Sequence, residues 1–306
     1  MTHRVLTVTL NPAVDVTYRV QALRVGETVR VPQVRSRAGG KGVNVAAVVT
    51  ALGEDSLVLA LTTTAEPDEF RAGLEELGLA HRLVPALAAV RRTIAVVADD
   101  GTTTMLQEHG FPASEGAEAE ITAALRDELE AGAGAVVISG SVPAGLDPEV
   151  PARLARLCAG FGVPVIADVS GAALRAAASS GAVLMPNSDE LAELVEDGRA
   201  GDLVAGGAAA VVATAGPEGA VALTARGSWR ARPAEVVAGN PTGAGDAAAA
   251  ALALHLARSG QRLDWPAALA DVVATSAAAV LRPVAGEIDR GARARWIPLT
   301  TVEETR

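Results

Sequence analysis

Short runs of β-branched residues alternate with longer stretches rich in alanine and leucine along most of the chain. Runs of continuous apolar residues followed by helix-length stretches are typical of βαβ units, in which helices cover both faces of a parallel sheet. The sequence therefore predicts an α/β fold. We expect strands at 5–9, 57–61, 135–138, 163–167, 183–185 and 210–213, and helices at 44–52, 69–77, 149–159, 174–178, 189–196, 247–257 and 266–281.

Two segments interrupt this alternation. Residues 16–37 show period-2 patterning with many arginines, and residues 92–107 predict a β-hairpin that turns at Asp99-Asp100-Gly101. We expect both to form a small antiparallel sheet, and its place between the first strand and the first helix suits a lid. No linker or change of composition divides the chain, so we expect a single domain over residues 1–306 that contains the lid strands.

Composition excludes several classes of protein. The chain has 306 residues, is 50% hydrophobic and carries a net charge of −10, which disfavours binding to nucleic acid or to anionic membranes. No apolar run reaches the roughly 18 residues of a membrane span. Asn11 and Pro12 lie where a signal peptide needs an apolar run, so we expect a cytoplasmic protein. Its one cysteine cannot form an internal disulfide, and its four histidines lack the spacing of metal ligands.

The segment 240–246, NPTGAGD, lies between an apolar run and a helix-length stretch of alanines. The small residues Gly243, Ala244 and Gly245 leave backbone N–H groups bare at a helix N-terminus, which together with the helix dipole form an anion site. A carboxylate beside such a site repels phosphate. Asp246 makes chemical sense there as the base for a hydroxyl that attacks phosphorus. The alternative is an ordinary helix cap, since Asp and Gly are common at helix starts.

A second glycine-rich segment, AGGKGVNVA, spans residues 38–46 and opens the first predicted helix. Its glycines allow close approach of a ligand, and Lys41 is the one lysine among 26 basic residues. Asn44 offers both a donor and an acceptor one helical turn later. The segment is not a Walker A loop, because the required flanking Gly and Ser/Thr are absent. The alternative is a hinge whose lysine is merely solvated.

Three weaker signals lie at predicted strand ends. Asp15 follows the first strand, at the edge where α/β sheets bind ligands, and suits hydrogen bonding to sugar hydroxyls; turns also contain this pattern. Asn187 and Glu190, three residues apart, suit a magnesium ion bound through waters, or a plain capping arrangement of the next helix. Arg91 and Arg92 open the hairpin and suit either an anionic substrate or a solvated face of the lid.

These segments, with SGSVPAG (139–145), DVSG (168–171) and TAGPEG (214–219), resemble the ribokinase-like (PfkB) carbohydrate kinases over residues 4–285. The combination of TLNPAVD with GGKGVN resembles the hexose-phosphate branch, which includes 1-phosphofructokinase and tagatose-6-phosphate kinase. The resemblance implies a three-layer α/β/α fold with a mostly parallel central sheet and a small β lid.

The resemblance also implies roles for particular residues. Asp246 matches the catalytic base, and Gly243, Ala244 and Gly245 match the anion hole for the transferring phosphoryl group. The remaining matches are substrate-binding Asp15, Gly39, Gly40, Lys41, Asn44, Arg91 and Ser139, ATP-binding Asn187, Thr214, Gly216 and Gly219, and Glu190 for magnesium, held through water. The implied cofactor is Mg²⁺ with ATP; a supporting monovalent cation and a homodimer formed through the lid are left open.

We therefore hypothesise an ATP-dependent kinase of a ketohexose phosphate, with fructose 1-phosphate converted to fructose 1,6-bisphosphate. Lys41 and the neighbouring arginines give a local positive patch, which matters more than the distant, screened net charge. Met185 stands where relatives often carry lysine, so one possible phosphate-facing charge is missing. Ala95 stands where close relatives often carry a second lid lysine, which weakens the choice of fructose 1-phosphate over tagatose 6-phosphate. The alternatives are a tagatose-6-phosphate or fructose-6-phosphate kinase, a kinase of a neutral sugar or nucleoside, and a catalytically silent regulator that binds sugar phosphate.

Overall fold

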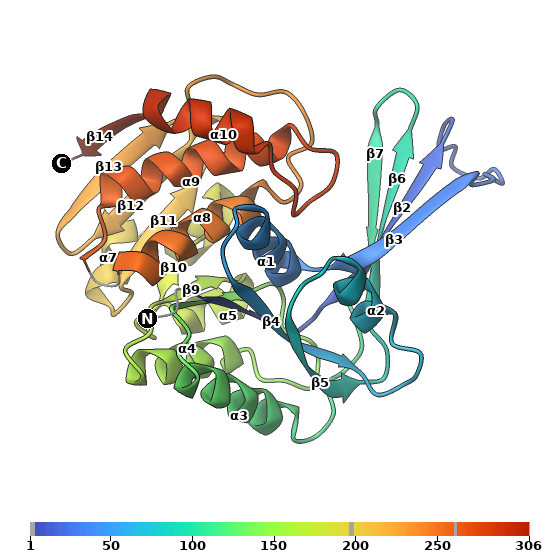
Figure 1. Ribbon diagram of the computed structural model, residues 1–306, viewed down its shortest axis with the longest axis horizontal. Coiled ribbons are helices and arrows are strands. Elements are labelled where there is room, and N and C mark those ends of the chain that lie inside the picture. The colour runs from blue at the N-terminus through green and yellow to red at the C-terminus, as the bar shows by residue number, and fades with distance from the viewer. Residues whose placement is uncertain (1–3, 196–198, 260–261, 306) are drawn as a thin grey trace.

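The computed structural model describes residues 4–195, 199–259 and 262–305, and its largest feature is a ten-stranded sheet (Figure 1). Its strands are β1 Val5–Thr9, β4 Ser56–Thr63, β5 His81–Leu87, β8 Ala135–Ser139, β9 Val165–Asp168, β10 Val183–Leu184, β11 Ala210–Thr214, β12 Ala220–Thr224, β13 Gly227–Arg232 and β14 Thr301–Thr305. They lie in the order β14-β13-β12-β11-β10-β9-β8-β1-β4-β5. In this order, neighbouring strands from β11 to β5 are parallel to each other, whereas β12, β13 and β14 join the sheet as antiparallel strands. This confirms the predicted, mostly parallel central sheet.

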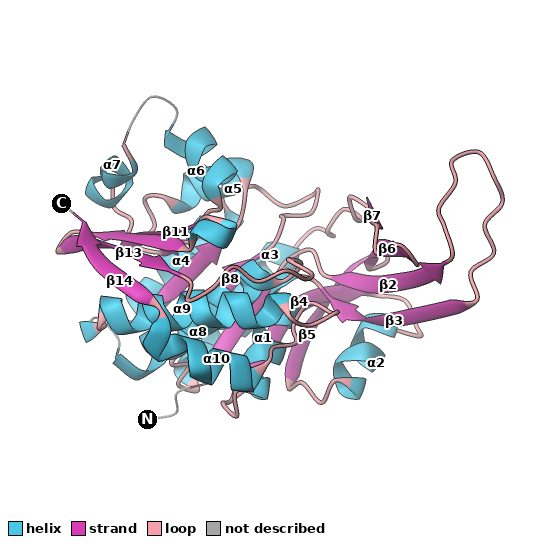
Figure 2. Ribbon diagram, turned by 90° about the horizontal axis from the view of Figure 1, so that it is seen from above, coloured by secondary structure: helices cyan, strands magenta, loops and turns pink. Residues whose placement is uncertain are grey.

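Helices cover both faces of this sheet and make the fold three-layered (Figure 1, Figure 2). One face carries α1 Lys41–Ala51, α8 Ala244–Ser259 and α9 Trp265–Val280, and α10 Arg290–Trp296 packs on α9. The other face carries α3 Ala117–Glu130, α4 Val150–Gly160 and α5 Gly171–Ala177, with α6 Ser188–Val195 and α7 Ala200–Ala205 at its edge. The other helical segments of the described residues are α2 Glu69–Glu76 and the short 3₁₀ turns η1 Gly216–Glu218 and η3 Ile297–Leu299.

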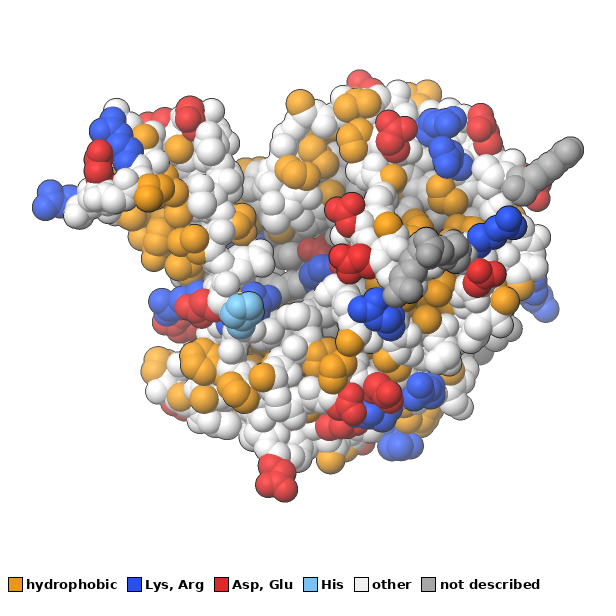
Figure 3. All heavy atoms as spheres, turned by 180° about the vertical axis from the view of Figure 1, so that it is seen from behind, with side chains coloured by type: hydrophobic (Ala, Val, Ile, Leu, Met, Phe, Trp, Pro, Cys, Tyr) orange, Lys and Arg blue, Asp and Glu red, His pale blue; other side chains and the backbone are white. Residues whose placement is uncertain are grey.

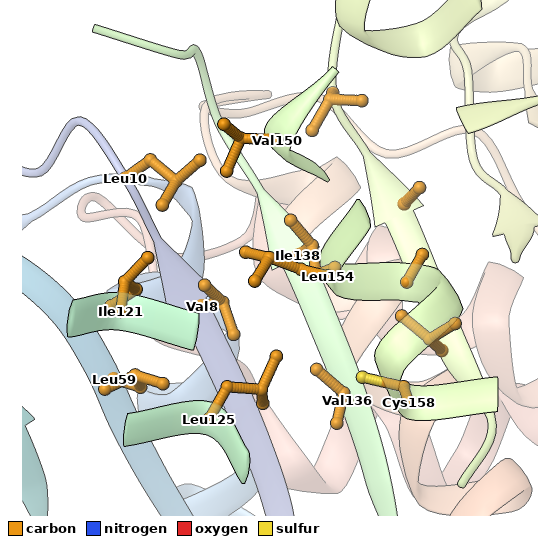
Figure 4. Close-up of a cluster of buried hydrophobic side chains, with 14 of the residues drawn as sticks. Val8, Leu10, Leu59, Ile121, Leu125, Val136, Ile138, Val150, Leu154 and Cys158 are labelled. Atoms are coloured by element: carbon orange, nitrogen blue, oxygen red, sulfur yellow. The ribbon is translucent and has the colours of Figure 1, made fainter. Parts of the chain in front are cut away.

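The two faces of the central strand β1 carry different side chains, although all of its residues are buried. Val8 faces Ile121 of α3 and Leu154 of α4 in the larger apolar core (Figure 4). Because successive side chains of a strand point to opposite faces, Thr7 and Thr9 lie on the α1 side, where a Cβ on Gly42 of α1 would meet Thr9. Both hydroxyls are buried without a hydrogen-bond partner.

Alanine builds most of the buried surface of α8. Ala247, Ala248, Ala249, Ala250 and Ala251 are all fully buried between α1, α9 and the sheet. Such short side chains let neighbouring backbones approach closely, which fits a chain with only 2% aromatic residues. Close packing on several sides leaves α8 little room to shift, so it is a rigid base for the residues of its first turn.

A second, four-stranded sheet stands away from the first and contains β2 Ala13–Val20, β3 Gln33–Gly39, β6 Arg91–Ala98 and β7 Thr103–Gln107. Figure 1 shows it projecting from the body of the molecule. The pairs β2–β3 and β6–β7 are antiparallel, as expected for segments 16–37 and 92–107, but β2 and β6 pair in parallel. The reason is that both strands leave the same edge of the central sheet, after the parallel strands β1 and β5.

Several elements have no counterpart among the expected ones: β5, α3, α7, α10 and the antiparallel strands β12, β13 and β14. The helix expected at 189–196 is α6, and Glu196 lies outside the described residues. Within the described part of the chain, none of the helices has the length and apolar character that a membrane span requires.

Candidate active site

A hollow separates the second sheet from the body of the molecule, and charged side chains lie at its floor (Figure 3). Ligands of open α/β sheets bind outside the carboxyl ends of the strands. Asp168 is the last residue of β9 and Ser139 the last residue of β8, while Lys41 and Asp246 lie in the first turns of α1 and α8. The fold thus brings together residues that are far apart in the sequence.

The start of α8 has the geometry of an anion site, with one difference from expectation. Gly243 has a φ of +82°, and a Cβ there would lie 2.7 Å from the Cβ of Ala285, so glycine is required on both counts. Among the described residues, the N–H groups of Gly243 and Gly245 find no acceptor. The N–H of Ala244, however, donates to the carbonyl of Pro241 at 3.1 Å. Two of the three expected amides are therefore free.

Asp246 is the buried acid of this site, only 6% exposed. The Nδ2 of Asn44 donates a hydrogen bond to its Oδ2 at 2.8 Å. Burial and, to a lesser extent, the charge of Asp168 raise the pKa of Asp246 to about 7, against the attraction of Lys41 and the hydrogen bond from Asn44. A carboxylate with a pKa near the working pH is suited to act as a general base.

The first turn of α1 carries the glycine-rich segment. Gly40 caps the helix at a φ of +101°, and a Cβ on Gly39 would fall 2.1 Å from the Oδ2 of Asp15. The Lys41 ammonium donates to the Oδ1 of Asp168 at 2.8 Å. Burial opposes the charge on Lys41, but attraction to Asp168 holds its pKa above the ordinary value, so it stays an ammonium ion.

The Asp15 side chain extends from β2 over Gly39 of the neighbouring strand β3, and Arg37 of β3 is its direct cross-strand neighbour. Burial raises the pKa of Asp15, against the attraction of Arg37 and Arg91, and burial lowers the pKa of both arginines. Arg91 is held by the carbonyls of Asn11 and Glu108, both at 3.3 Å.

Arg92, by contrast, is no part of this group. It pairs with Glu69 of α2 at 2.9 Å and is half exposed, because neighbouring residues of a strand face opposite sides. Of the two interpretations offered for Arg91 and Arg92, the structure favours a solvated surface for Arg92.

Ser139 lies beneath the first turn of α1. It is 2% exposed, and its hydroxyl has no hydrogen-bond partner. A Cβ on Gly42 would lie 3.3 Å from its Oγ. The hydroxyls of Thr7 and Thr9 and the Oδ1 of Asn44 are likewise buried and unpartnered. Buried polar atoms in native proteins usually have partners, so this cluster has unused capacity for water or ligand.

The residues expected to bind the nucleotide form a separate group. Asn187 pairs with Thr214 in an isolated parallel bridge, and the turn of Gly216 and Gly219 follows β11. The Oδ1 of Asn187 accepts from the N–H of Glu190 at 2.9 Å, and the Oε2 of Glu190 accepts from the N–H of Asn187 at 3.0 Å. This is the capping arrangement given above as the alternative, and it leaves the Oε1 of Glu190 uncommitted within the pair.

Two residues of the site, Arg37 and Asp168, were not among the expected site residues. Arg35 and Arg37 are two residues apart in the predicted strand segment 16–37, which places both on the same face of the sheet. The sequence does not say which residue of the neighbouring strand lies opposite each of them. Asp168 directly follows the strand predicted at 163–167, and a position at a strand end is itself a signal for a site residue.

A sequence model described as "pfkB family carbohydrate kinase" matches residues 8–289. The chain belongs to this family. It is 33% identical to the 1-phosphofructokinase of Xanthomonas campestris over 287 residues, covering 88% of this chain and 89% of that protein. It is 31% identical to the ATP-dependent 6-phosphofructokinase isozyme 2 of Mycobacterium tuberculosis over 276 residues, covering 83% and 78%.

The fold also matches a solved phosphofructokinase structure. Phosphofructokinase-2 from Escherichia coli in complex with fructose-6-phosphate superposes with a TM-score of 0.85 at 25% identity, covering 97% of this chain and 99% of that chain. The predicted ribokinase-like fold and the assignment to the carbohydrate kinases are confirmed. Kinases of this family use ATP, which implies a divalent metal ion bound with the nucleotide.

Proposed function

We propose that the protein transfers the terminal phosphoryl group of ATP to a hydroxyl of a ketohexose phosphate, with fructose 1-phosphate as acceptor and fructose 1,6-bisphosphate as product. One observation carries this proposal: the buried carboxylate of Asp246 lies at the open start of α8 and is oriented by Asn44 from the glycine-rich helix α1. A base so placed takes the proton from the attacking hydroxyl, a contribution of order 10²–10⁴ in rate.

The acceptor is proposed to bind between the second sheet and α1. Asp15, Asn44 and the backbone of Gly39 and Gly40 face its hydroxyls, and Arg91 and Ser139 receive its phosphate. A sugar phosphate carries about −1.5 to −2 charges near neutral pH, which the local arginines attract although the whole chain is acidic.

Phosphoryl transfer depends mostly on positioning and on stabilisation of charge. The free N–H groups of Gly243 and Gly245 are proposed to stabilise the charge on the transferring group, and the helix dipole of α8 at this N-terminus favours the same charge. Ala244 completes the backbone of this anion hole. The second sheet then acts as a lid that excludes water, so that the sugar rather than solvent is phosphorylated.

The nucleotide is proposed to lie against Asn187, Thr214, Gly216 and Gly219. The free Oε1 of Glu190 fits a magnesium ion, which prefers oxygen ligands and keeps several waters while bound to one or two carboxylates and the nucleotide phosphates. When bound, Mg²⁺ neutralises charge on those phosphates. No group of three or more acidic, histidine or cysteine residues suited to a metal occurs in the described ranges, which agrees with a metal held mainly through ATP and water.

The same resemblance suggests three further properties of the protein. They are a supporting monovalent cation, a homodimer formed through the second sheet, and action in the cytoplasm. Size-exclusion chromatography with light scattering tests the dimer, and kinetics in sodium and potassium salts test the cation.

A coupled assay of ADP release tests the function. The acceptors are fructose 1-phosphate, fructose 6-phosphate, tagatose 6-phosphate, and unphosphorylated fructose and ribose. We expect the highest kcat/KM for fructose 1-phosphate and a loss of at least about 10²-fold in kcat for Asp246→Asn. Asp127→Asn, at an exposed site on α3, is the control and is expected to keep full activity.

Each other result assigns a different function. Preference for fructose 6-phosphate or tagatose 6-phosphate changes the acceptor within the same branch, and preference for a neutral sugar supports the ribokinase-like alternative. If none of the sugars stimulates ADP release by the wild type, the catalytically silent regulator is the only hypothesis that remains.

A further inference from the structure

One ion pair in the site has no assigned purpose. The Lys41 ammonium at the start of α1 lies 2.8 Å from the Oδ1 of Asp168 at the end of β9. The Asp168 side chain is 9% exposed, whereas that of Lys41 is 41% exposed. The lysine is therefore held by a nearly buried carboxylate while part of it remains open to the hollow.

The basic side chains of the site have different acidic neighbours. The charges of Asp168, Asp246 and Glu190 act on Lys41, whereas those of Arg37 and Arg91 act on Asp15, which is itself a weaker neighbour of Asp246. Lys41 and its acidic neighbours lie beside the start of α8 and the proposed nucleotide residues, and the two arginines lie on the second sheet. The resemblance places Lys41 with the sugar phosphate, but its electrostatic neighbours place it with the general base and the nucleotide.

A single ammonium between two carboxylates is subject to competition. If Asp168 did not hold Lys41, the lysine would be drawn to Asp246, whose charge already acts on it. A base paired directly with an ammonium ion has a lower proton affinity. With Asp168 present, Asp246 accepts its side-chain hydrogen bond from the neutral amide of Asn44.

We propose that Asp168 is a positioning residue, an inference that rests on the proposed function. Asp168 holds the Lys41 ammonium beside the start of α8, facing the transferring phosphoryl group. In this way it keeps Lys41 from neutralising the general base Asp246. Lys41 then stabilises the charge on the transferring group, and the acceptor's own phosphate is left to the arginines of the second sheet.

The test compares the pH dependence of kcat/KM in single and double variants. Asp168→Asn removes both the partner of Lys41 and a like charge near Asp246, so the acid limb is expected to move down by about one pH unit or more. kcat is expected to fall at least tenfold, and the KM for the sugar phosphate to change less than threefold. Lys41→Met is expected to move the acid limb up instead. The other groups that act on Asp246, Asp15 and Asn44, are unchanged in both variants.

The double variant separates positioning from direct catalysis. If Asp168 acts through Lys41, adding Asp168→Asn to Lys41→Met lowers kcat no further. The matched control is Asp271→Asn, which removes an equally buried, ion-paired aspartate between α9 and α10. It is expected to lower the melting temperature without moving the pH profile or either KM. Asp168→Glu, which keeps the charge, is expected to recover part of the lost kcat.

Two results overturn the proposal while leaving the kinase assignment intact. One is an active Asp168→Asn variant with an unchanged acid limb. The other is a Lys41→Met variant whose main defect is a higher KM for the sugar phosphate. A wild-type protein without sugar-stimulated ADP release instead refutes the proposed function itself.

Discussion

Replacing Asp246 by asparagine is expected to stabilise the fold at alkaline pH while it removes the proposed general base. Burial raises the pKa of this carboxyl from its ordinary value of 3.8 to about 7. An acid with a higher pKa in the folded state binds more protons when folded, so its contribution to stability falls as the pH rises from about 4 through 7. Asparagine keeps an oxygen that can accept from the Asn44 amide and carries no charge, so the variant avoids this loss.

The structure sets the size of the effect. A pKa difference of roughly three units between the folded and unfolded chain corresponds to about 4 kcal/mol. At pH 8 we expect Asp246→Asn to be more stable than wild type by up to this amount, which raises the melting temperature by roughly 8 °C. The difference is expected to shrink steadily as the pH is lowered toward 4, where the wild-type carboxyl is protonated.

Thermal unfolding followed by circular dichroism from pH 4 to pH 9 measures this difference. Asp127→Asn is the control, because it removes an exposed carboxylate of the same chemistry. A stability difference between wild type and Asp246→Asn that is the same at pH 5 and pH 8 would refute the reasoning, because it would mean that the carboxyl has an ordinary pKa in the folded protein.

Three further outcomes follow from contacts in the structure. In Gly39→Ala the new methyl group would occupy the space of the Asp15 carboxylate, so the KM for the acceptor is expected to rise at least tenfold while the KM for ATP is unchanged, as initial-rate kinetics will show. Arg293→Met leaves the buried Asp271 with His255 and Thr275 as its remaining side-chain partners and is expected to cost about 3 kcal/mol in urea unfolding, with kcat retained. For the wild type, kcat/KM for the acceptor is expected to rise with pH through the pKa of Asp246, about 7, and to level off above it. A profile that is flat from pH 5.5 to 8 would contradict the proposed role of Asp246 as base.

The central layers of the fold could be predicted from the sequence because their signals are local. The buried strand β1 and the helix α1, which begins at Lys41, came from apolar runs and a glycine-rich boundary only a few residues long. The strands β12 and β13 were missed, since AVALT and GSWRAR contain few β-branched residues and become strands through their antiparallel neighbours. Helix α3 was missed although its sequence is helix-forming throughout.

The contacts of the site depend on pairings that no local pattern encodes. Lys41 meets Asp168 across 127 positions, and Asn44 meets Asp246 across 202. The sequence predicted Asp246 as a base because a carboxylate beside an anion site needs a chemical reason, and that role stays a prediction. It did not identify the partner of Lys41, because which strand end lies opposite α1 depends on the order of strands in the sheet.

The strands of the second sheet come from two separate parts of the chain, so four tethers join it to the central layers: one before β2, one after β3, one before β6 and one after β7. No single excision removes it, and losing either hairpin strips the other of its parallel neighbour. The tether after β3 is Gly40 itself, directly before Lys41, and Asp15 lies in the strand that the first tether enters. Any tilt of this sheet therefore displaces the residues proposed to bind the acceptor and also pulls on the first turn of α1.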